Sequence, residues 1–452
     1  MSEYITPILS NEHQVNMQVP NCMPTTPNIG IVFHDTKYII GVMSIKRYRY
    51  RAYPKPGQKQ PIAALFGCVR VVYNDALAYS ENCYKETKKK PSNKELSARL
   101  TNLKKTAEKS WLSDVSAVPL QQSLRDLDKA YSNFFASATG KRKGPKVSAP
   151  RFKKRSSRQT ARFTSQAFSV RQTSHGVGFV RLSKIGELRF VLSRALPPSP
   201  TSVTLIQESD GNYYVSFVVE AEPKSTPAPT AYAVGVDMGL KDLAITINSN
   251  GQSTVYANPR PLRKAEKKLG KLQRQLARKK KGSNRYAKQR LQVAKAYSKV
   301  KNTRSHYLHQ VANQIVDENQ VIALETLSIA GLAKTRLGKS VLDASWGQLT
   351  RLIKEKAVER GREVVGIDRF APTTQTCSIC GTPNGRKPLN VRDWVCVGCG
   401  SRVERDLNAA VNIMLAAGLA ERINEHGGDG VRRRLAGAVI VDTVHPPRAA
   451  TL

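Results

Sequence analysis

The sequence predicts a mixed α/β protein built from several domains, and three observations support this prediction. The chain has 452 residues, a length that suits roughly two to four domains. Short apolar strand-like segments and long segments with helical periodicity occur in both halves of the chain. Two closely spaced cysteine pairs lie in the C-terminal half and are typical of an inserted metal-binding module.

The charge of the chain predicts a polyanionic partner. It has 73 Lys and Arg against 34 Asp and Glu, a formal net charge of +39. Such an excess repels itself in a compact fold, whereas nucleic acid rewards it through phosphate neutralisation and counterion release. A membrane surface is the rival partner, but we find no uninterrupted apolar run of the length that spans a bilayer. We expect nucleic acid as the partner, no membrane, and a cytoplasmic protein that joins the nucleoid when bound to DNA.

The N-terminal half reads as a β domain interrupted by helices. Residues 1–43 lack both periodicity and basic excess, and we expect them to form a disordered extension. Residues 44–58 belong to the β domain: residues 44–53 alternate basic and aromatic side chains, as a strand with one phosphate-facing side does, and Pro54 and Pro56 end this strand. Residues 59–138 carry apolar side chains at helical spacing and are predicted to be a helical insert. Residues 139–225 begin with a basic loop and return to strands.

The C-terminal half predicts a second α/β domain over residues 230–371 and 405–420. Its strands are short and apolar, as buried strands are. Between them, residues 260–304 form a long helical region that contains 18 Lys or Arg and one acid. Residues 421–452 are rich in Gly and Arg, and we expect a mobile tail there.

Three carboxylates stand where a metal-dependent hydrolase needs them. Asp237 follows the apolar strand Ala233–Val236, and Glu325 follows Val321–Leu324. Asp406 opens the last helix. A carboxylate at the end of a central strand needs a cleft or a cation. Together the three acids are suited to hold two Mg²⁺ ions about 4 Å apart for phosphodiester hydrolysis.

Each acid also has an ordinary structural interpretation. A single acid at a strand end is more often a turn residue than a ligand, and Asp406 alone would serve as the N-cap of its helix. The coincidence of all three in so basic a chain favours catalysis.

The two cysteine pairs predict a zinc ribbon over residues 372–404. Cys377 and Cys380 form one pair, and Cys396 and Cys399 form the other, with 15 residues between the pairs. This is the spacing of a tetrahedral Cys₄ site. Four thiolates leave no open position for a substrate, so we expect one structural Zn²⁺.

These motifs, in this order, resemble the TnpB family of transposon-associated RNA-guided nucleases, which are related to type V CRISPR effectors. The similarity rests on Gly235–Gly239, on Ala323–Leu327, and on a zinc ribbon placed just before Arg405–Ala410. In the N-terminal half, Phe66–Asn74 and Pro150–Lys153 are also similar to family segments. The resemblance covers roughly residues 44–415.

The resemblance implies a RuvC (RNase H-like) nuclease domain with the zinc ribbon inserted in it. It also implies a wedge-like β-barrel, interrupted by a helical recognition insert, ahead of the nuclease domain. A guide RNA and double-stranded target DNA become the expected partners, with no obligate protein partner. By motif match, Asp237, Glu325 and Asp406 take the catalytic, Mg²⁺-binding roles. The chain departs from the family in its first 42 residues and at Glu404, where Asp is common.

Candidate nucleic-acid contacts lie in the basic stretches and on one polar helix. Phosphate contacts are expected from the basic residues, because such contacts follow helix shape rather than base sequence. Tyr48 has two open interpretations, base stacking and packing of the β domain. The polar helix is a candidate reader of a short motif beside the target. The candidates are Arg47, Tyr48, Arg49, Gln121, Gln122, Lys141, Arg142, Lys146, Arg151, Lys153, Lys264, Lys268, Arg274 and Arg278.

Three other functions remain open at this level. A compact type V CRISPR effector would have the same sequence features. A transposase or junction resolvase with an RNase H fold would share the acids but act on DNA without a guide RNA. An RNA-guided binder without catalysis would not need the acids, and the retention of all three argues against it.

Overall fold

The computed structural model describes residues 44–173, 175–221, 228–388, 390–419 and 440–445. The predicted extension over residues 1–43 lies outside these ranges. The described N-terminal part holds a seven-stranded antiparallel sheet in the order β2-β6-β7-β1-β5-β4-β3. Its strands are β1 (Ser44–Tyr53), β2 (Gln159–Thr164), β3 (Phe168–Gln172), β4 (Val177–Leu182), β5 (Gly186–Val191), β6 (Ser202–Gln207) and β7 (Tyr213–Ala221).

This sheet is open, which differs from the predicted barrel. Strands β2 and β3 are its two edges, and no pairing between them closes the sheet in the described part of the chain. After the helices the strands return earlier than predicted, because β2 lies inside residues 139–166, which were expected to form the basic loop. Alternation along the strands fixes its two faces. Tyr50 points into the core, with its ring centroid 5.3 Å from that of Phe190 and 6.1 Å from that of Phe217.

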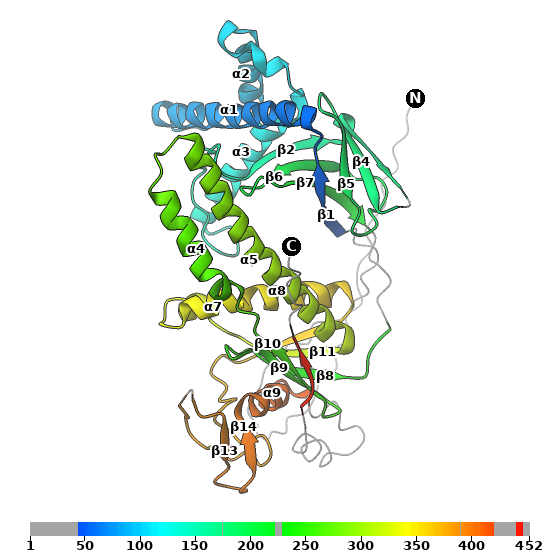
Figure 1. The fold of residues 1–452 in the computed structure, drawn as a ribbon, viewed down its shortest axis with the longest axis vertical. Coiled ribbons are helices and arrows are strands. Elements are labelled where there is room, and N and C mark those ends of the chain that lie inside the picture. The colour runs from blue at the N-terminus through cyan, green and yellow to red at the C-terminus, as the bar shows by residue number, and fades with distance from the viewer. Residues whose placement is uncertain (1–43, 174, 222–227, 389, 420–439, 446–452) are drawn as a thin grey trace, which may run out of the picture. The chain divides into compact units, whose positions relative to one another are not determined.

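Helices inserted between β1 and β2 complete this core (Figure 1). By length and composition alone, α1 could cross a membrane, but half of its most apolar window is buried inside the protein. Its side chains Ile62, Leu65 and Leu77 belong to the same hydrophobic cluster as the sheet. The inserted elements are α1 (Pro56–Thr87), α2 (Asn93–Lys105), η1 (Ala107–Ser113) and α3 (Ala117–Ala138), and a short turn η2 (Ser165–Ala167) follows β2.

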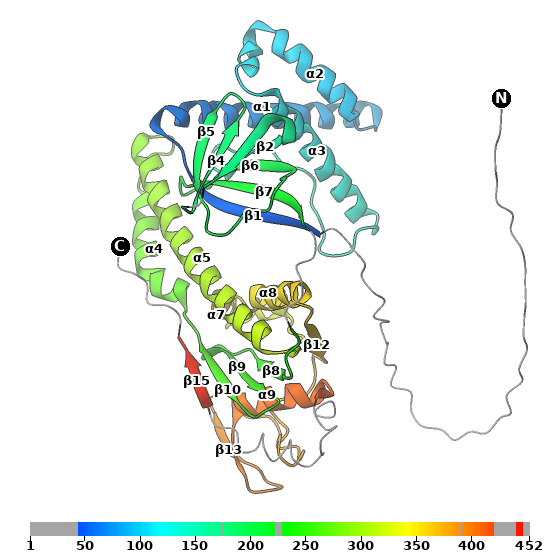
Figure 2. The same ribbon diagram turned by 90° about the vertical axis from the view of Figure 1, so that its right-hand side faces the viewer.

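The second sheet has six strands in the order β12-β11-β8-β9-β10-β15. Strands β8, β11 and β12 are parallel to one another, and β9 runs antiparallel to β8. Figure 2 shows this sheet with α8 on one side and α9 on the other. The strands are β8 (Ala233–Asp237), β9 (Asp242–Asn248), β10 (Ser253–Ala257), β11 (Val321–Glu325), β12 (Glu363–Ile367) and β15 (Ile440–Val444).

Strand β15 corrects the prediction of a mobile tail. Its five residues lie within the segment 421–452 and pair in parallel with β10 at the edge of the sheet. The backbone groups of an edge strand such as β10 are left unpaired unless another segment covers them. The sequence shows Gly and Arg enrichment over the whole segment, which hides this short apolar strand.

Each face of the six-stranded sheet is covered by its own helices. Helices α5 (Asn284–Glu318) and α8 (Trp346–Glu359) share one hydrophobic cluster with β8 and β11. Helix α9 (Arg405–Ala416) forms a separate cluster on the opposite face. Gly235 allows this close approach, because a Cβ there would lie 2.1 Å from the carbonyl oxygen of Ala410.

A basic helical hairpin connects β10 to β11. It consists of α4 (Pro261–Ala277) followed by α5, and it accounts for the predicted basic helical region. Two short helices come after β11, α6 (Ile329–Leu332) and α7 (Gly338–Ala344). The buried carboxylate of Asp343 on α7 accepts hydrogen bonds from the first backbone amides of α4, those of Leu262 at 3.0 Å and Arg263 at 3.1 Å. It also pairs with Arg304 at 2.8 Å.

We predict that Asp343→Ala lowers the free energy of unfolding by about 3 kcal/mol, because it leaves the half-buried guanidinium of Arg304 and two backbone amides of α4 without their partner. Denaturant unfolding followed by circular dichroism measures this loss. Glu266→Ala is a matched control, since Glu266 pairs with Lys339 where both side chains are exposed. Its loss should cost at most about 1 kcal/mol. Equal costs for the two variants would contradict the structural role of Asp343.

Candidate active site and metal centre

Two of the three predicted acids meet at one edge of the six-stranded sheet. Asp237 is the last residue of β8, and Glu325 is the last residue of β11. These strands are parallel neighbours, and their register places Val236 beside Leu324. Since the next residue on each strand is the acid, both carboxylates emerge at the carboxyl ends, where α/β sheets bind their ligands.

The third acid comes from the helix that packs across β8. Asp406 lies in the first turn of α9 and is 9% exposed. The N-cap of α9 is Glu404, whose carboxylate accepts a hydrogen bond from the backbone amide of Leu407 at 2.6 Å. The interpretation of Asp406 as the N-cap is therefore wrong, and its carboxylate has no capping role. The direct contact between Gly235 and α9 brings the first turn of the helix near the end of β8.

The acids lie close enough for their charges to act on one another. Desolvation by the surrounding protein, followed by the negative charges of Glu325, Asp406 and Glu404, raises the pKa of Asp237 well above its usual range. Burial also raises the pKa of Glu325, against the effect of a hydrogen bond from Thr373. Like charges held together in this way are stabilised by a bound cation.

The donor set fits a hard divalent cation, although the carboxylates are not yet arranged around one. Arg392 directs Nη1 at both oxygens of Asp406, at distances of 3.0 and 2.8 Å. Asp406 must leave this pair, at least in part, to bind a metal ion. Within the described ranges, the only set of three or more acids, histidines or cysteines with ligand atoms already gathered is formed by the cysteines. Oxygen donors are the ligands that Mg²⁺ prefers.

The raised pKa of Asp237 leads to a stability prediction. At pH values between the pKa of Asp237 in the unfolded chain and its higher pKa in the folded protein, the native state binds more protons than the unfolded state. Without metal, the free energy of unfolding therefore falls as the pH rises through the folded-state pKa. Below the unfolded pKa this destabilisation is absent. In EDTA at neutral pH we expect Asp237→Asn to melt about 2 °C or more above the wild type. Melting curves across the pH range test this prediction. Asp242→Asn is the control, because Asp242 does not belong to the group of acids around Asp237. If the difference in melting temperature between Asp237→Asn and the wild type does not shrink at acidic pH, the assignment of Asp237 to the acidic site is contradicted.

The four predicted zinc cysteines come together in a small module between β12 and α9. Their sulfur atoms lie within 4.8 Å of one another. The Sγ–Sγ distance is 3.9 Å between Cys377 and Cys399 and 3.5 Å between Cys380 and Cys396. Tetrahedral zinc with Zn–S bonds of about 2.3 Å spaces its sulfurs by about 3.8 Å. The geometry therefore fits a Cys₄ zinc site. The module contains the hairpin β13 (Asp393–Val395) and β14 (Arg402–Glu404).

Local hydrogen bonds favour the thiolate form of Cys396, whereas burial raises the pKa of Cys377 to about 12. Desolvation raises the pKa of Cys396, but hydrogen bonds from the backbone at Cys399, from Asn384 and from Gly398 outweigh it and lower this pKa to about 6. Trp394 is 7% exposed and packs with Cys377 and Cys396 in the small core of the module. This position assigns Trp394 to the cover of the cysteine cluster.

The predicted nucleic-acid contacts divide into exposed and buried residues. Gln122 is 7% exposed, and Gln121 is hydrogen-bonded to Ser97 at 3.0 Å, so neither side chain is free to read a base. Lys153 lies 3.8 Å above the ring of Tyr73. Tyr48 is partly buried against the sheet core, which supports the packing interpretation. The exposed candidates are Arg47, Arg49, Lys141, Arg142, Lys146, Arg151, Lys264, Lys268, Arg274 and Arg278.

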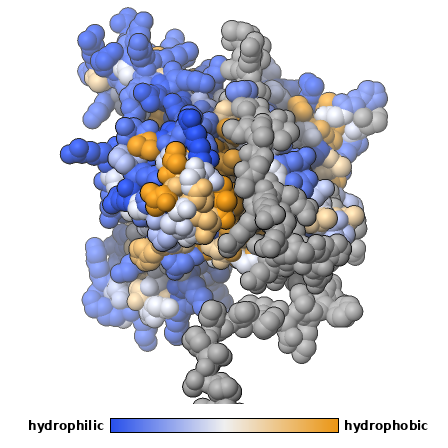
Figure 3. Space-filling view, turned by 90° about the horizontal axis from the view of Figure 1, so that it is seen from below, coloured by the Kyte–Doolittle hydropathy of each residue, from blue (hydrophilic) through white to orange (hydrophobic). Residues whose placement is uncertain are grey.

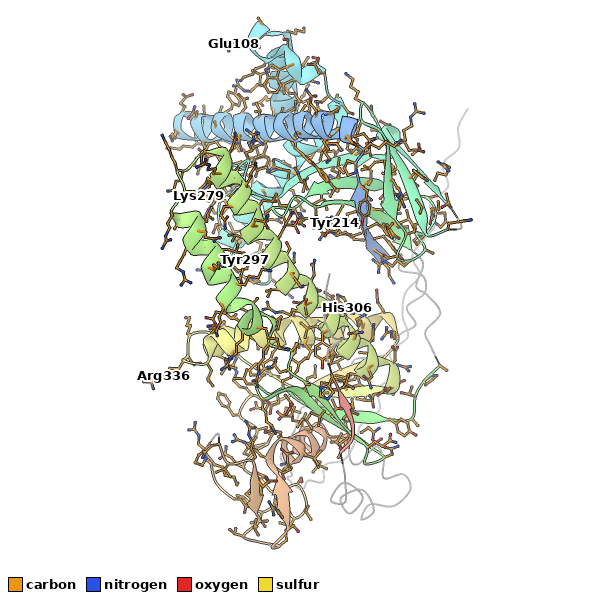
Figure 4. All side chains as sticks on the ribbon, in the orientation of Figure 1. Glu108, Tyr214, Lys279, Tyr297, His306 and Arg336 are labelled. Atoms are coloured by element: carbon orange, nitrogen blue, oxygen red, sulfur yellow. The ribbon has the colours of Figure 1, made fainter. Side chains whose placement is uncertain are left out.

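The exposed basic residues lie on β1, on the segment between α3 and β2, and on the α4–α5 hairpin. Arg49 stands on the outer face of β1, 2.7 Å from Glu208 and 3.9 Å above the ring of Tyr214. Figure 4 shows Tyr214 on the sheet, and Lys279 and Tyr297 on the α4–α5 hairpin. Seen from below in Figure 3, the described surface is mostly hydrophilic around a smaller hydrophobic area.

Sequence reasoning missed the residues that support the acids. Arg392, which pairs with Asp406, lies in the zinc ribbon and has no sequence pattern that indicates this role. Thr373 donates its hydroxyl proton to Glu325 at 2.8 Å and comes from a segment without a recognisable pattern. Asn408 and Asn412 both donate to the backbone carbonyl of Thr373. The sequence could have indicated a shared role for these two asparagines, because their spacing of four residues places both amides on one face of α9.

Comparison with known proteins decides the family. Three family models match, described as "Probable transposase" (residues 216–336), "Cas12f1-like, TNB domain" (346–413) and "Helix-turn-helix domain" (43–89). A "Putative RNA-guided DNA endonuclease" of Streptomyces pristinaespiralis is 39% identical over 397 residues, which cover 86% of this chain and 93% of that protein. The "Putative RNA-guided DNA endonuclease InsQ" of Escherichia coli K12 is 31% identical, over 83% of this chain and 93% of that protein.

The chain belongs to the TnpB/OrfB family. The resemblance drawn from the motifs is thereby confirmed. The structure of a mini-RNA-guided endonuclease, CRISPR-Cas_phi3, shares the fold at 10% identity with a TM-score of 0.50, over 85% of this chain and 93% of that one. In this TnpB-family chain, residues 43–89 hold β1 and the single continuous helix α1 rather than two helices.

Proposed function

We propose that this chain is an RNA-guided endonuclease that cuts double-stranded DNA by metal-dependent phosphodiester hydrolysis. The observation that supports the proposal best is the convergence of Asp237, Glu325 and Asp406 from two parallel strands and one helix. The names of the relatives point to the same activity. We assign residues 230–371 and 405–420 to a RuvC (RNase H-like) nuclease domain and residues 372–404 to the zinc ribbon.

The three acids are proposed to bind two Mg²⁺ ions, which would activate a water molecule and stabilise the leaving oxygen. The contribution of the protein is to hold the carboxylates at fixed positions on rigid elements. Arg392 pairs with Asp406, and we propose that it contacts a phosphate of the substrate when Asp406 binds a metal ion. The four cysteines are proposed to bind one structural Zn²⁺, because they offer no open position for substrate.

The N-terminal sheet, its helices and the basic hairpin are proposed to bind a transposon-derived guide RNA and to recognise a short motif beside the target. The hairpin α4–α5 presents Lys264, Lys268, Arg274 and Arg278 on exposed positions. Contacts of such residues with phosphates would hold an A-form duplex independently of its sequence.

We predict that changing these four residues to Gln flattens the salt dependence of RNA binding. The slope of log K against log salt should fall by about 0.7–0.9 for each phosphate that the variant no longer neutralises. Filter binding over a salt series measures this slope. Lys90 and Lys109 serve as controls, because Asp128 and Asp75 already neutralise them. Equal slopes for the hairpin variant and the wild type would exclude the hairpin from the RNA-binding surface.

The proposal is tested by purifying the protein expressed together with its native flanking DNA and sequencing the RNA that accompanies it. We expect a discrete RNA with a constant scaffold and one end that extends beyond the element. Random cellular RNA that is competed away by salt would favour the alternative of an RNase H-fold transposase or resolvase that needs no guide. A guide that derives from a repeat array would favour a compact type V CRISPR effector.

A further inference from the structure

The segment between β12 and the first zinc cysteine is fixed to the active site by a side-chain hydroxyl. Thr373, in this segment, is 7% exposed. Its Oγ1 donates a hydrogen bond of 2.8 Å to Oε1 of Glu325. The described contacts of Glu325 engage this oxygen, so Oε2 is the oxygen available to a cation. A carboxylate that is held through one oxygen has a fixed orientation for the other.

Two amides of α9 hold the same segment in place, and we call Asn408 and Asn412 the amide clamp. Asn412 donates to the carbonyl oxygens of Thr373 at 2.7 Å and Thr376 at 2.8 Å. Asn408 donates to the same two carbonyls at 3.2 and 2.9 Å and accepts a hydrogen bond from the backbone amide of Ser378 at 2.9 Å. Asn408 is 1% exposed, so breaking these bonds would leave buried polar groups unpaired.

The clamp connects three parts of the site through one rigid helix. Helix α9 carries Asp406 in its first turn and the clamp in its next two turns. The clamped segment carries Thr373 and continues directly into Cys377, the first cysteine of the metal cluster. A displacement of the zinc module therefore moves the hydroxyl that orients Glu325.

We propose that Thr373 is a positioning residue for Glu325 and that the amide clamp couples the zinc module to the carboxylate site. This inference rests on the proposed function, since it assumes that Glu325 binds a metal ion. Packing alone does not require the hydroxyl, because Val has nearly the same shape as Thr. The proton that Thr373 directs at the carboxylate is the specific element of the arrangement.

The test compares Thr373→Val, Thr373→Ser and the control Thr326→Val in the full-length protein loaded with its RNA. Thr326 follows Glu325, and its hydroxyl donates to the carbonyl of Ile367 at 2.7 Å, so the control loses a similar bond without touching the carboxylate. Mn²⁺ binding is measured by electron paramagnetic resonance, and cleavage is measured over a Mg²⁺ series. Zinc content is measured to verify that the module is intact.

We expect Thr373→Val to weaken Mn²⁺ binding and to raise the Mg²⁺ concentration for half-maximal cleavage about tenfold or more, with zinc retained. Thr373→Ser should restore both values, and Thr326→Val should leave them unchanged. Asn412→Leu should act in the same direction. Adding Thr373→Val to Asn412→Leu should then have little further effect, because the two substitutions remove the same constraint on Glu325.

Two results would overturn the proposal. One is a loss of activity in Thr373→Val with unchanged metal dependence, and the other is a Thr373→Ser variant as impaired as Thr373→Val. Failure of the proposed function is distinguishable from both, because the wild type would then show neither guided cleavage nor Mn²⁺ binding that depends on Glu325.

Discussion

Asp237→Ala is expected to abolish DNA cleavage while guide RNA and target DNA still bind. Asp237 ends β8, where the charges of Glu325 and Asp406 both act on it, and its loss would remove one of the three carboxylates of the proposed metal site. Metal ions supply several kcal/mol of transition-state stabilisation, and each 1.36 kcal/mol is tenfold in rate. The cleavage rate should therefore fall by about a thousandfold or more. Plasmid cleavage under single-turnover conditions measures the rate, and gel-shift assays measure binding.

The conservative control for this variant is Asp242→Ala. Asp242 is the first residue of β9, five residues after Asp237. Its carboxylate lies next to the exposed Lys241, and it does not belong to the group of three acids. We expect its cleavage rate to remain close to that of the wild type. Normal cutting by Asp237→Ala would refute the site, and a loss of target binding would mean that Asp237 has a structural role.

Removing zinc is expected to produce the largest structural effect. Zinc binding by a Cys₄ site contributes about 10–16 kcal/mol of folding free energy in small modules. The hydrophobic core of this module consists of Trp394, Val403 and two of the cysteines, which is too little to hold it together without metal. Cys396→Ser should therefore unfold residues 372–404. Limited proteolysis and zinc analysis measure this, and cleavage should be lost because Thr373 lies within these residues and Asp406 follows them closely.

Cys83→Ser provides the control, because Cys83 lies on α1 and outside the cluster. We expect full zinc content and unchanged proteolysis for this variant. A Cys396→Ser protein that resists protease and cuts DNA normally would exclude a structural zinc.

The sequence allowed the acids and cysteines to be found because their positions follow from simple rules. Asp237 and Glu325 each end an apolar strand, and parallel strands present their carboxyl ends at one edge of the sheet. The cysteine spacing is specific by itself. The contacts between these groups could not be read in the same way, since the contact of Arg392 with Asp406 depends on how the zinc module packs on α9 and not on a local sequence pattern.

Errors arose where burial or pairing depends on distant segments. Gln122 has a polar side chain, but α3 turns it toward the core. Strand β15 is too short to stand out in a Gly- and Arg-rich tail, and it forms because β10 offers an open edge. The closure predicted for the N-terminal barrel requires a pairing between β2 and β3, strands whose sequences do not show which neighbours they take.

Reprogramming the guide tests the central claim most directly. The guide segment of the co-purified RNA is replaced by one that matches a new plasmid site beside the same flanking motif, and the products are sequenced. The account predicts Mg²⁺-dependent double-strand cuts that move to the new site, none at the old site, and none with Asp237→Ala. Cuts that stay at the original DNA sequence whatever the guide would contradict RNA guidance and would favour an enzyme that recognises DNA directly.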